Sequence, residues 1–425
     1  MPAPGMASSA LRDSVGRLPS TGDGEMSTRT PAGVRVGLLT LGVVSSMVVV
    51  ARLLLRGVSS INLDSLLADP LSFHGLVTLP SILALACFVL ALLPRIVVIN
   101  LAVLMVLMGA AELAAWALAP RQSGIPDQPE TFYTPHSTLG YVLTRSVVVH
   151  HRLAAGGTAG ITYEIDDLGR RHTPASSDSV RSSFLLFFGD SNTFGEGLGQ
   201  TDTLPSRAGE LAAGHRPYNY GVPGYGPQHM LALLDVRRLA DEVSEPAGNA
   251  VYFFIPAHVA RVIGSSRVST GWGRHFPYYQ QGPDGNLLAS GDFVHGRPLT
   301  TLLYHGWNQS NLAAASGVDL PPRYSDRHYR LTARILAESG RQLARQVRLG
   351  SFHVVLGQAY NAPQREVLDR MRAALEREGV PVLDYSRLLD PRDSRYRLSD
   401  VDYHNSGPAN RALAARLTAD LGIAR

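Results

Sequence analysis

The sequence predicts an α/β protein, a three-layer α/β/α sandwich around a parallel sheet, preceded by an N-terminal three-helix transmembrane region. Two observations carry this prediction. From residue 183 onward, short apolar runs alternate with longer stretches of helical periodicity, as in a parallel sheet covered on both faces. Before residue 120, three apolar segments that carry almost no charge each approach the roughly 20 residues that a membrane helix needs.

The N-terminal part divides into a polar tail and a membrane region. Residues 1–34 are rich in Ser, Gly, Pro and Arg and lack periodicity, which predicts a disordered tail. Region 35–120 follows, and its expected spans are about 37–55, 76–93 and 96–119. Because the basic tail favours the cytoplasm, three spans would place everything after residue 120 outside the cytoplasm.

A lead-in connects the membrane region to the main domain. Residues 121–182 comprise a polar, proline-bearing linker and a small strand-rich segment, with β-like stretches at 146–151 and 160–165. The main domain is expected over 183–425.

Five strands and four helices are expected within the main domain. The strands are 184–188, 218–221, 250–255, 352–356 and 380–384, and the helices are 228–240, 331–347, 366–378 and 408–421. Residues 261–323 interrupt the alternation with a long aromatic and glycine-rich insertion. An insertion of this length often covers or shapes an active site.

Composition excludes some classes of protein. The net charge is only +4 over 425 residues, and no basic cluster is interleaved with aromatic residues, so nucleic acid is not expected as a partner. Cys87 is the single cysteine, which rules out an intrachain disulfide and a cysteine-based metal site.

A serine stands where the first strand of the main domain ends. The stretch FFGDSNTFGEGL places Ser191 directly after an apolar run. Open α/β folds bind ligands at the carboxyl edge of the sheet, so this position suits a nucleophile. An ordinary exit from strand to loop is the alternative reading, and a serine hydroxyl also needs a base to become reactive.

A candidate base lies near the C-terminus, in LSDVDYHNSGPANRAL. His404 precedes the closing helix, and Asp402 and Asp400 stand two and four residues before it. A carboxylate this close in sequence can orient the imidazole and stabilise its charged form. A surface loop that caps the closing helix is the alternative, and the two roles are compatible.

The second strand ends in YNYGVPGYG. A glycine at this strand end, Gly221, can leave its backbone N–H open to the oxyanion of a substrate. The alternative is a turn built from glycine and proline.

These blocks, in this order, resemble the SGNH (GDSL-type) hydrolase superfamily, and in particular its membrane-anchored bacterial members. The resemblance covers residues from about 183 to 425 and implies a flavodoxin-like sheet. It implies Ser191 as nucleophile, Gly221 as oxyanion donor and His404 as base. Asp402 is the preferred acid because related alginate-modifying members carry Asp two residues before the histidine, and Asp400 is the reserve.

The third block departs from the family pattern. Where the family has an Asn that donates to the oxyanion, this chain has Ala257, followed by His258. Either His258 replaces that donor or the oxyanion hole has two donors. Loss of one such donor costs on the order of 10²–10³ in rate, so the departure raises the question of whether activity is impaired.

The resemblance implies a membrane-anchored serine esterase that needs no metal or cofactor and acts on an extracytoplasmic acylated glycan or lipid. One alternative is an O-acyltransferase of envelope or secreted polysaccharide, which would work with a multispan acyltransferase partner. A second alternative is an SGNH protein of weak or no activity that serves binding or assembly.

Overall fold

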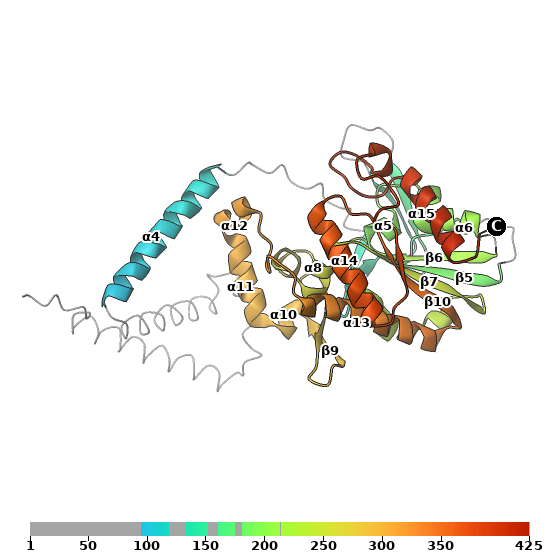
Figure 1. Ribbon diagram of the computed structural model, residues 1–425, viewed down its shortest axis with the longest axis horizontal. Coiled ribbons are helices and arrows are strands. Elements are labelled where there is room, and N and C mark those ends of the chain that lie inside the picture. The colour runs from blue at the N-terminus through green and yellow to red at the C-terminus, as the bar shows by residue number, and fades with distance from the viewer. Residues whose placement is uncertain (1–94, 119–131, 152–159, 175–180, 213, 425) are drawn as a thin grey trace, which may run out of the picture. The chain divides into compact units, whose positions relative to one another are not determined.

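The computed structural model describes residues 95–118, 132–151, 160–174, 181–212 and 214–424 (Figure 1). The chain divides into two compact units, Met1–Ala114 and Ala115–Arg425, and each is considered by itself.

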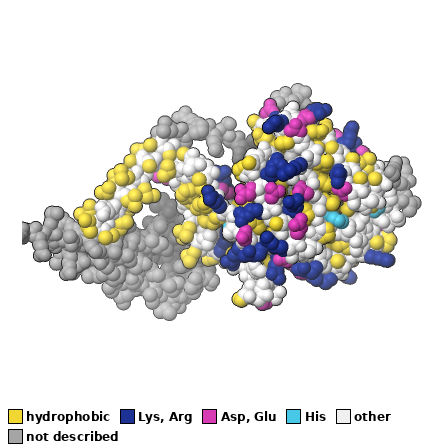
Figure 2. All heavy atoms as spheres, in the orientation of Figure 1, with side chains coloured by type: hydrophobic (Ala, Val, Ile, Leu, Met, Phe, Trp, Pro, Cys, Tyr) yellow, Lys and Arg dark blue, Asp and Glu magenta, His cyan; other side chains and the backbone are white. Residues whose placement is uncertain are grey.

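One helix, α4 (Arg95–Leu118), represents the N-terminal region in the described residues. It coincides with the third expected span, and its apolar side chains are largely exposed, among them Leu104, Met105 and Val106 (Figure 2). The tail, the first two expected spans and the linker 121–130 lie outside the described residues. Among the helices that the structure describes, none satisfies both the length and the hydropathy that a membrane crossing requires.

A five-stranded parallel sheet forms the centre of the second unit. Its strands are β5 (Ser183–Gly189), β6 (His215–Gly221), β7 (Ala247–Phe254), β10 (Leu349–Leu356) and β11 (Val382–Asp384). Neighbours run in the order β11-β10-β7-β5-β6, and every pair is parallel. All five expected strands are therefore present. β6, the second of these strands along the chain, lies at the edge of the sheet next to β5, the first, and this is the flavodoxin-like strand order.

Helices cover both faces of this sheet (Figure 1). One face packs against α7 (Pro227–Val236), α8 (Ala257–Ile263), α13 (Asp326–Gln346) and α14 (Ala362–Arg377), and the other against α6 (Leu204–Leu211) and α15 (Gly407–Asp420). Because successive side chains of a strand point to opposite faces, β5 supplies both cores. Phe184, Leu186 and Phe188 enter the first, and Leu185 and Phe187 enter the second. The fold is the expected three-layer sandwich.

The remaining elements are short. They are α5 (Ser191–Phe194) and the 3₁₀ turns η2 (Gln200–Asp202), η3 (Leu239–Asp241) and η4 (Ser394–Tyr396).

The insertion has its own small fold. Helix α8 continues to Ile263, so the interruption begins three residues later than expected, at Gly264. It contains α9 (Ser266–Thr270), the antiparallel hairpin of β8 (Pro277–Gln281) and β9 (Leu287–Asp292), α10 (Phe293–Gly296), α11 (Pro298–Gln309) and α12 (Asn311–Ser316). Val268, Phe276 and Phe293 form its core.

The strand-rich lead-in consists of two antiparallel pairs. These are β1 (Tyr133–His136) with β2 (Gly140–Leu143), and β3 (Val147–His151) with β4 (Ile161–Ile165). β3 and β4 coincide with the two β-like stretches seen in the sequence. Arg171 follows β4 and forms β-bridges to Ile165 and to Asn219 of the edge strand β6. The lead-in is thereby joined to the edge of the main sheet.

The side chain of Arg171 ties the lead-in to the loop that follows Ser191. It is buried (1% exposed) and donates to the carbonyl oxygens of Phe194, Gly195 and Leu198, at 2.9, 2.5 and 2.6 Å. Its guanidinium also packs on the ring of Tyr163, 4.6 Å from the centroid. Burial lowers the pKa of Arg171 to about 10, so the side chain remains charged at neutral pH.

We expect Arg171→Met to destabilise the second unit by about 3 kcal/mol, because it removes the charged donor that three carbonyl groups share and leaves that of Leu198 without a partner in a buried loop. Urea denaturation of the purified chain measures this change. Arg145→Met is the matched control, since Arg145 is an exposed arginine of the same lead-in, and we expect it to change stability by less than about 0.5 kcal/mol. Equal effects of the two substitutions would contradict the proposed support.

Candidate active site

Ser191 begins a short helix at the carboxyl end of β5. Asp190 caps this helix, α5, by accepting a hydrogen bond from the Asn192 N–H at 3.0 Å. Gly195 ends it in the left-handed region (φ 85°), and a Cβ there would lie 2.6 Å from Thr203 Cγ2. A glycine is therefore needed at this turn. The strand, cap and turn together hold the serine at the edge of the sheet.

His404 lies in a loop that two sets of contacts hold in place. On one side, a β-bridge joins Arg397 to Asn405, and the Leu398 N–H donates to the His404 carbonyl at 3.1 Å. On the other side, Ser406 caps α15 through the Ala409 N–H at 3.3 Å. The loop thus caps the closing helix and carries the histidine as well.

The structure brings Ser191, His404 and Asp402 into one hydrogen-bonded chain. His404 Nε2 lies 2.8 Å from Ser191 Oγ, and His404 Nδ1 lies 2.6 Å from Asp402 Oδ1. The same carboxylate oxygen accepts the His404 backbone N–H at 3.0 Å. A second tie joins the two loops, because the Asn405 N–H donates to Asn192 Oδ1 at 3.2 Å. This is the geometry of a hydroxyl, a base and an orienting carboxylate.

Asp400, the reserve acid, lies elsewhere. Its carboxylate is 86% exposed and pairs with Arg397 Nη2 at 2.7 Å. Of the two candidate acids, only Asp402 contacts the imidazole.

A carboxylate that the sequence analysis did not single out also lies close to His404. Glu196 Oε2 is 3.8 Å from His404 Nε2. Burial of the imidazole lowers the pKa of His404, but the Asp402 hydrogen bond and the charges of Glu196 and Asp402 outweigh it. The net effect raises the pKa above 6.5. Glu196 belongs to the same short stretch as Ser191. This closeness along the chain was the only feature of the sequence that could have pointed to a role for Glu196 in the site.

Gly221 does not offer the N–H that the sequence analysis expected. The residue is buried, and its N–H donates to Asn219 Oδ1 at 3.0 Å. A Cβ at this position would lie 2.4 Å from the Phe194 nitrogen. Glycine is required here because β6 packs against the backbone of α5, and its N–H already has an acceptor.

His258 is likewise not placed as an oxyanion donor. It is fully buried beneath the nucleophile turn, where Nδ1 accepts the Ile255 N–H at 3.3 Å and Nε2 lies 3.3 Å from Asp190 Oδ2. Burial lowers the pKa of His258, so the ring is neutral, with its proton on Nε2 facing Asp190. The expectation for His258 failed because its position next to Ala257 does not tell which way the side chain points.

Arg261, one helical turn after Ala257 on α8, faces the same side of the helix as Ala257. Ala257 and Arg261 both line the cleft that contains Ser191. Arg261 Nη1 donates to Asp190 Oδ2 and to the Tyr225 carbonyl, each at 2.7 Å. Its guanidinium lies over the ring of Trp272, 5.8 Å from the centroid. In the sequence, Arg261 stands at the start of the expected insertion, and no motif marks it.

The cleft has a volume of about 1030 Å³. Both reacting loops contribute to its wall, together with Ala257 and Arg261 from α8 and with Tyr360, which follows β10. Tyr403, 53% exposed, packs edge-on against Tyr360 at the rim. The site is thus open to a substrate considerably larger than an acetyl group.

No family model matches the chain, and no curated protein matches it. Similar solved structures include a lipolytic protein of the G-D-S-L family from Veillonella parvula, with 12% identity, 56% of this chain and 97% of that chain covered, and a TM-score of 0.33. Another is Est24, a carbohydrate acetylesterase from Sinorhizobium meliloti, with 10% identity, 56% and 98% covered, and a TM-score of 0.32.

A third is an acetyl xylan esterase, Est2A, from Butyrivibrio proteoclasticus, with 11% identity, 62% and 68% covered, and a TM-score of 0.34. At such TM-scores, the assignment of the fold rests on the strand order and layers of this chain.

We expect Glu196→Gln to lower the pKa of His404, because it removes a negative charge 3.8 Å from Nε2. The imidazole would then lose its proton at a lower pH than in the parent chain. NMR titration of the His404 ring, assigned by the signal missing in His404→Gln, measures the shift.

Glu210→Gln is the control, since Glu210 is a half-exposed glutamate paired with Arg207. A titration of His404 that Glu196→Gln leaves unchanged would show that the contact with Glu196 has no electrostatic effect.

Proposed function

We propose that this protein is an ester hydrolase of the SGNH type with Ser191 as its nucleophile. The hydrogen-bonded chain from Ser191 through His404 to Asp402 is the observation that carries the proposal. His404 Nε2 accepts the Ser191 proton while Oγ forms a bond to the acyl carbon. The imidazolium, held by Asp402, then returns that proton to the leaving alcohol as the ester bond breaks. Water releases the acid from the acyl-enzyme by the same proton transfers.

The oxyanion would be held by backbone N–H groups. Ser191 supplies one at the start of α5. For the second we propose Gly224, in the turn that follows β6, in place of Gly221. Gly224 adopts φ 87°, and within the described part of the chain no acceptor lies against its N–H. The guanidinium of Arg261 places positive charge at the same cleft, where Ala257 has no side-chain donor.

Acylated glycans or lipids are the substrate class that we propose. The size of the cleft and the exposed ring of Tyr403 at its rim support a bulky substrate, since aromatic faces suit both sugar rings and acyl chains.

Hydrolysis of p-nitrophenyl acetate and butyrate by the full-length chain tests the proposal. We expect activity that Ser191→Ala abolishes, together with labelling of Ser191 by a fluorophosphonate. A folded chain that neither hydrolyses these esters nor reacts with the fluorophosphonate would contradict the proposal and favour a binding protein. Labelling without hydrolysis would instead favour an acyltransferase that requires its acceptor.

We expect Asp402→Asn to lower kcat/KM on the order of 10³–10⁴-fold, because the imidazole loses the group that sets its tautomer. Asp400→Asn is the matched control and should leave kcat/KM within about twofold, since an exposed surface carboxylate contributes little. Steady-state kinetics on p-nitrophenyl butyrate measures both. The reverse ranking would make Asp400 the functional acid.

We further propose that the hydrolase domain is anchored in a membrane by three helices and lies outside the cytoplasm. Support comes from the three apolar segments of the sequence and from the exposed apolar side chains of α4. Alkaline phosphatase fused to the C-terminus should be active, and a reporter that works only in the cytoplasm should stay silent. The opposite pattern would overturn the orientation.

A further inference from the structure

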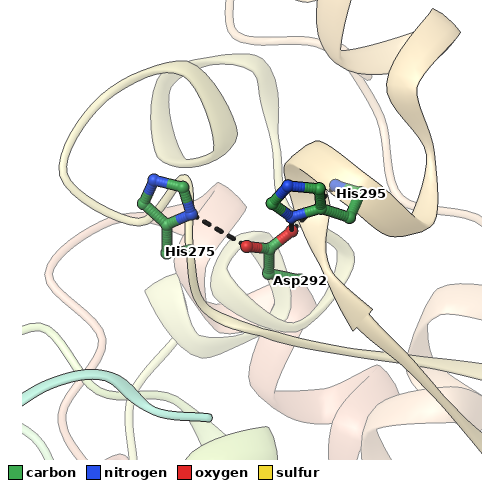
Figure 3. A group of neighbouring side chains, drawn as sticks. All are labelled: His275, Asp292 and His295. Carbon is green, nitrogen blue, oxygen red and sulfur yellow. Dashed lines mark hydrogen bonds and ion pairs between the residues drawn. The ribbon is translucent and has the colours of Figure 1, made fainter. Parts of the chain in front are cut away.

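Two imidazoles converge on one carboxylate in the insertion, away from Ser191. His275 Nδ1 lies 2.8 Å from Asp292 Oδ2, and His295 Nδ1 lies 2.8 Å from Asp292 Oδ1 (Figure 3). One potential ligand atom from each of the three residues lies within 4.8 Å of the other two. Among the described residues, the ion pairs of Asp292 are with these two histidines. We call this set the His–Asp–His cluster.

The local fold fixes the three side chains relative to one another. Asp292 is the last residue of β9 and pairs across the hairpin with Pro277 of β8, so His275 lies just before the base of the hairpin. Asp292 also caps α10, accepting the His295 N–H at 2.8 Å. His295 follows three residues later on that helix. The turn before β8, the end of β9 and helix α10 therefore present the cluster from one small region.

The cluster has the chemistry of a transition-metal site. We propose that His275, Asp292 and His295 bind one divalent metal ion of the zinc type, through the two Nδ1 atoms and a carboxylate oxygen. Imidazole and carboxylate are common zinc ligands, and zinc accepts three protein ligands with water in the fourth position. The His275 and His295 side chains are 47% and 76% exposed, which leaves an open side for that water.

Binding requires a rearrangement, because the two Nδ1 atoms contact different oxygens of Asp292. Tetrahedral ligand atoms about 2.0–2.1 Å from zinc lie roughly 3.3 Å apart, whereas the three ligand atoms here lie within 4.8 Å of one another, so the exposed side chains would have to turn toward a common centre. Binding through Nδ1 requires each imidazole to carry its proton on Nε2.

A metal ion here would act on structure, since the cluster does not line the cleft of Ser191. It would join the base of the hairpin to α10. Trp272, three residues before His275, covers the guanidinium of Arg261. A bound metal ion would therefore stabilise the part of the insertion that reaches the cleft, and it would have no role in the cleavage of the ester bond.

Calorimetric titration of Zn²⁺ into the tag-free, full-length chain, first treated with a chelator, tests the proposal. We expect one Zn²⁺ per chain, and with Co²⁺ the visible absorption bands of a low-symmetry site. His275→Ala and His295→Ala should each weaken Zn²⁺ binding by at least about tenfold, because even residues that only support a ligand cost 10–100-fold when removed. Asp292→Asn should weaken it too, while keeping an oxygen to cap α10.

His172→Ala is the matched control. His172 and Glu164 form an exposed pair with a nitrogen–oxygen distance of 3.5 Å but without a second imidazole, so this variant should bind Zn²⁺ as the parent does. No binding by the parent chain would overturn the proposal. Unchanged binding by the His275→Ala, His295→Ala double variant, with circular dichroism unchanged, would overturn it as well.

Discussion

The site is organised around a carboxylate that no solvent reaches. Asp190 is completely buried directly beneath Ser191. Burial alone would raise its pKa, but the charge of Arg261 and the hydrogen bonds from Arg261 and His258 reverse the effect, so its pKa is held far below the usual range. One of its oxygens caps the helix that carries the serine, and the other receives Arg261. A buried charge needs such partners, because its desolvation costs several kcal/mol.

This constraint explains why α8 carries two basic side chains, of which only His258 was a candidate for the site from the sequence. Arg261 and His258 both reach Asp190 from the same helix. The Nε2 of His258 faces Asp190 and is not available to a substrate, whereas Arg261 also borders the cleft. The turn that holds Ser191 and the helix that forms the wall of the cleft are therefore linked through one carboxylate.

Segments outside the core sandwich stabilise the same turn. From the lead-in, Arg171 binds three carbonyl groups of the loop after Ser191. From the C-terminal loop, the Asn405 N–H donates a hydrogen bond to the side-chain oxygen of Asn192. A proton can pass between Ser191 and His404 only if loops 213 residues apart keep a fixed separation, and these contacts supply that rigidity. The insertion adds Trp272 over Arg261.

Most of the α/β sandwich could be predicted because its signals are local. Apolar runs of strand length, helical periodicity and their alternation follow from the geometry of single elements and require no knowledge of their neighbours. The order of Ser191, Gly221, Asp402 and His404 along the chain was enough to propose a hydrolase. The same reasoning predicts membrane spans in segments that lie mostly outside the described residues, and these remain predictions.

Other features depended on how distant segments pack. Asp402 rather than Asp400 reaches the imidazole because Arg397 holds the other carboxylate at the surface. Gly221 has its N–H taken by Asn219, and His258 points inward to a buried charge. Residue type and spacing along the chain drew attention to each of these positions but did not decide its role. The direction in which a side chain points, and the acceptor that a backbone N–H finds, depend on the segments that pack against that residue. The spacing of residues along the chain does not show which segments those are.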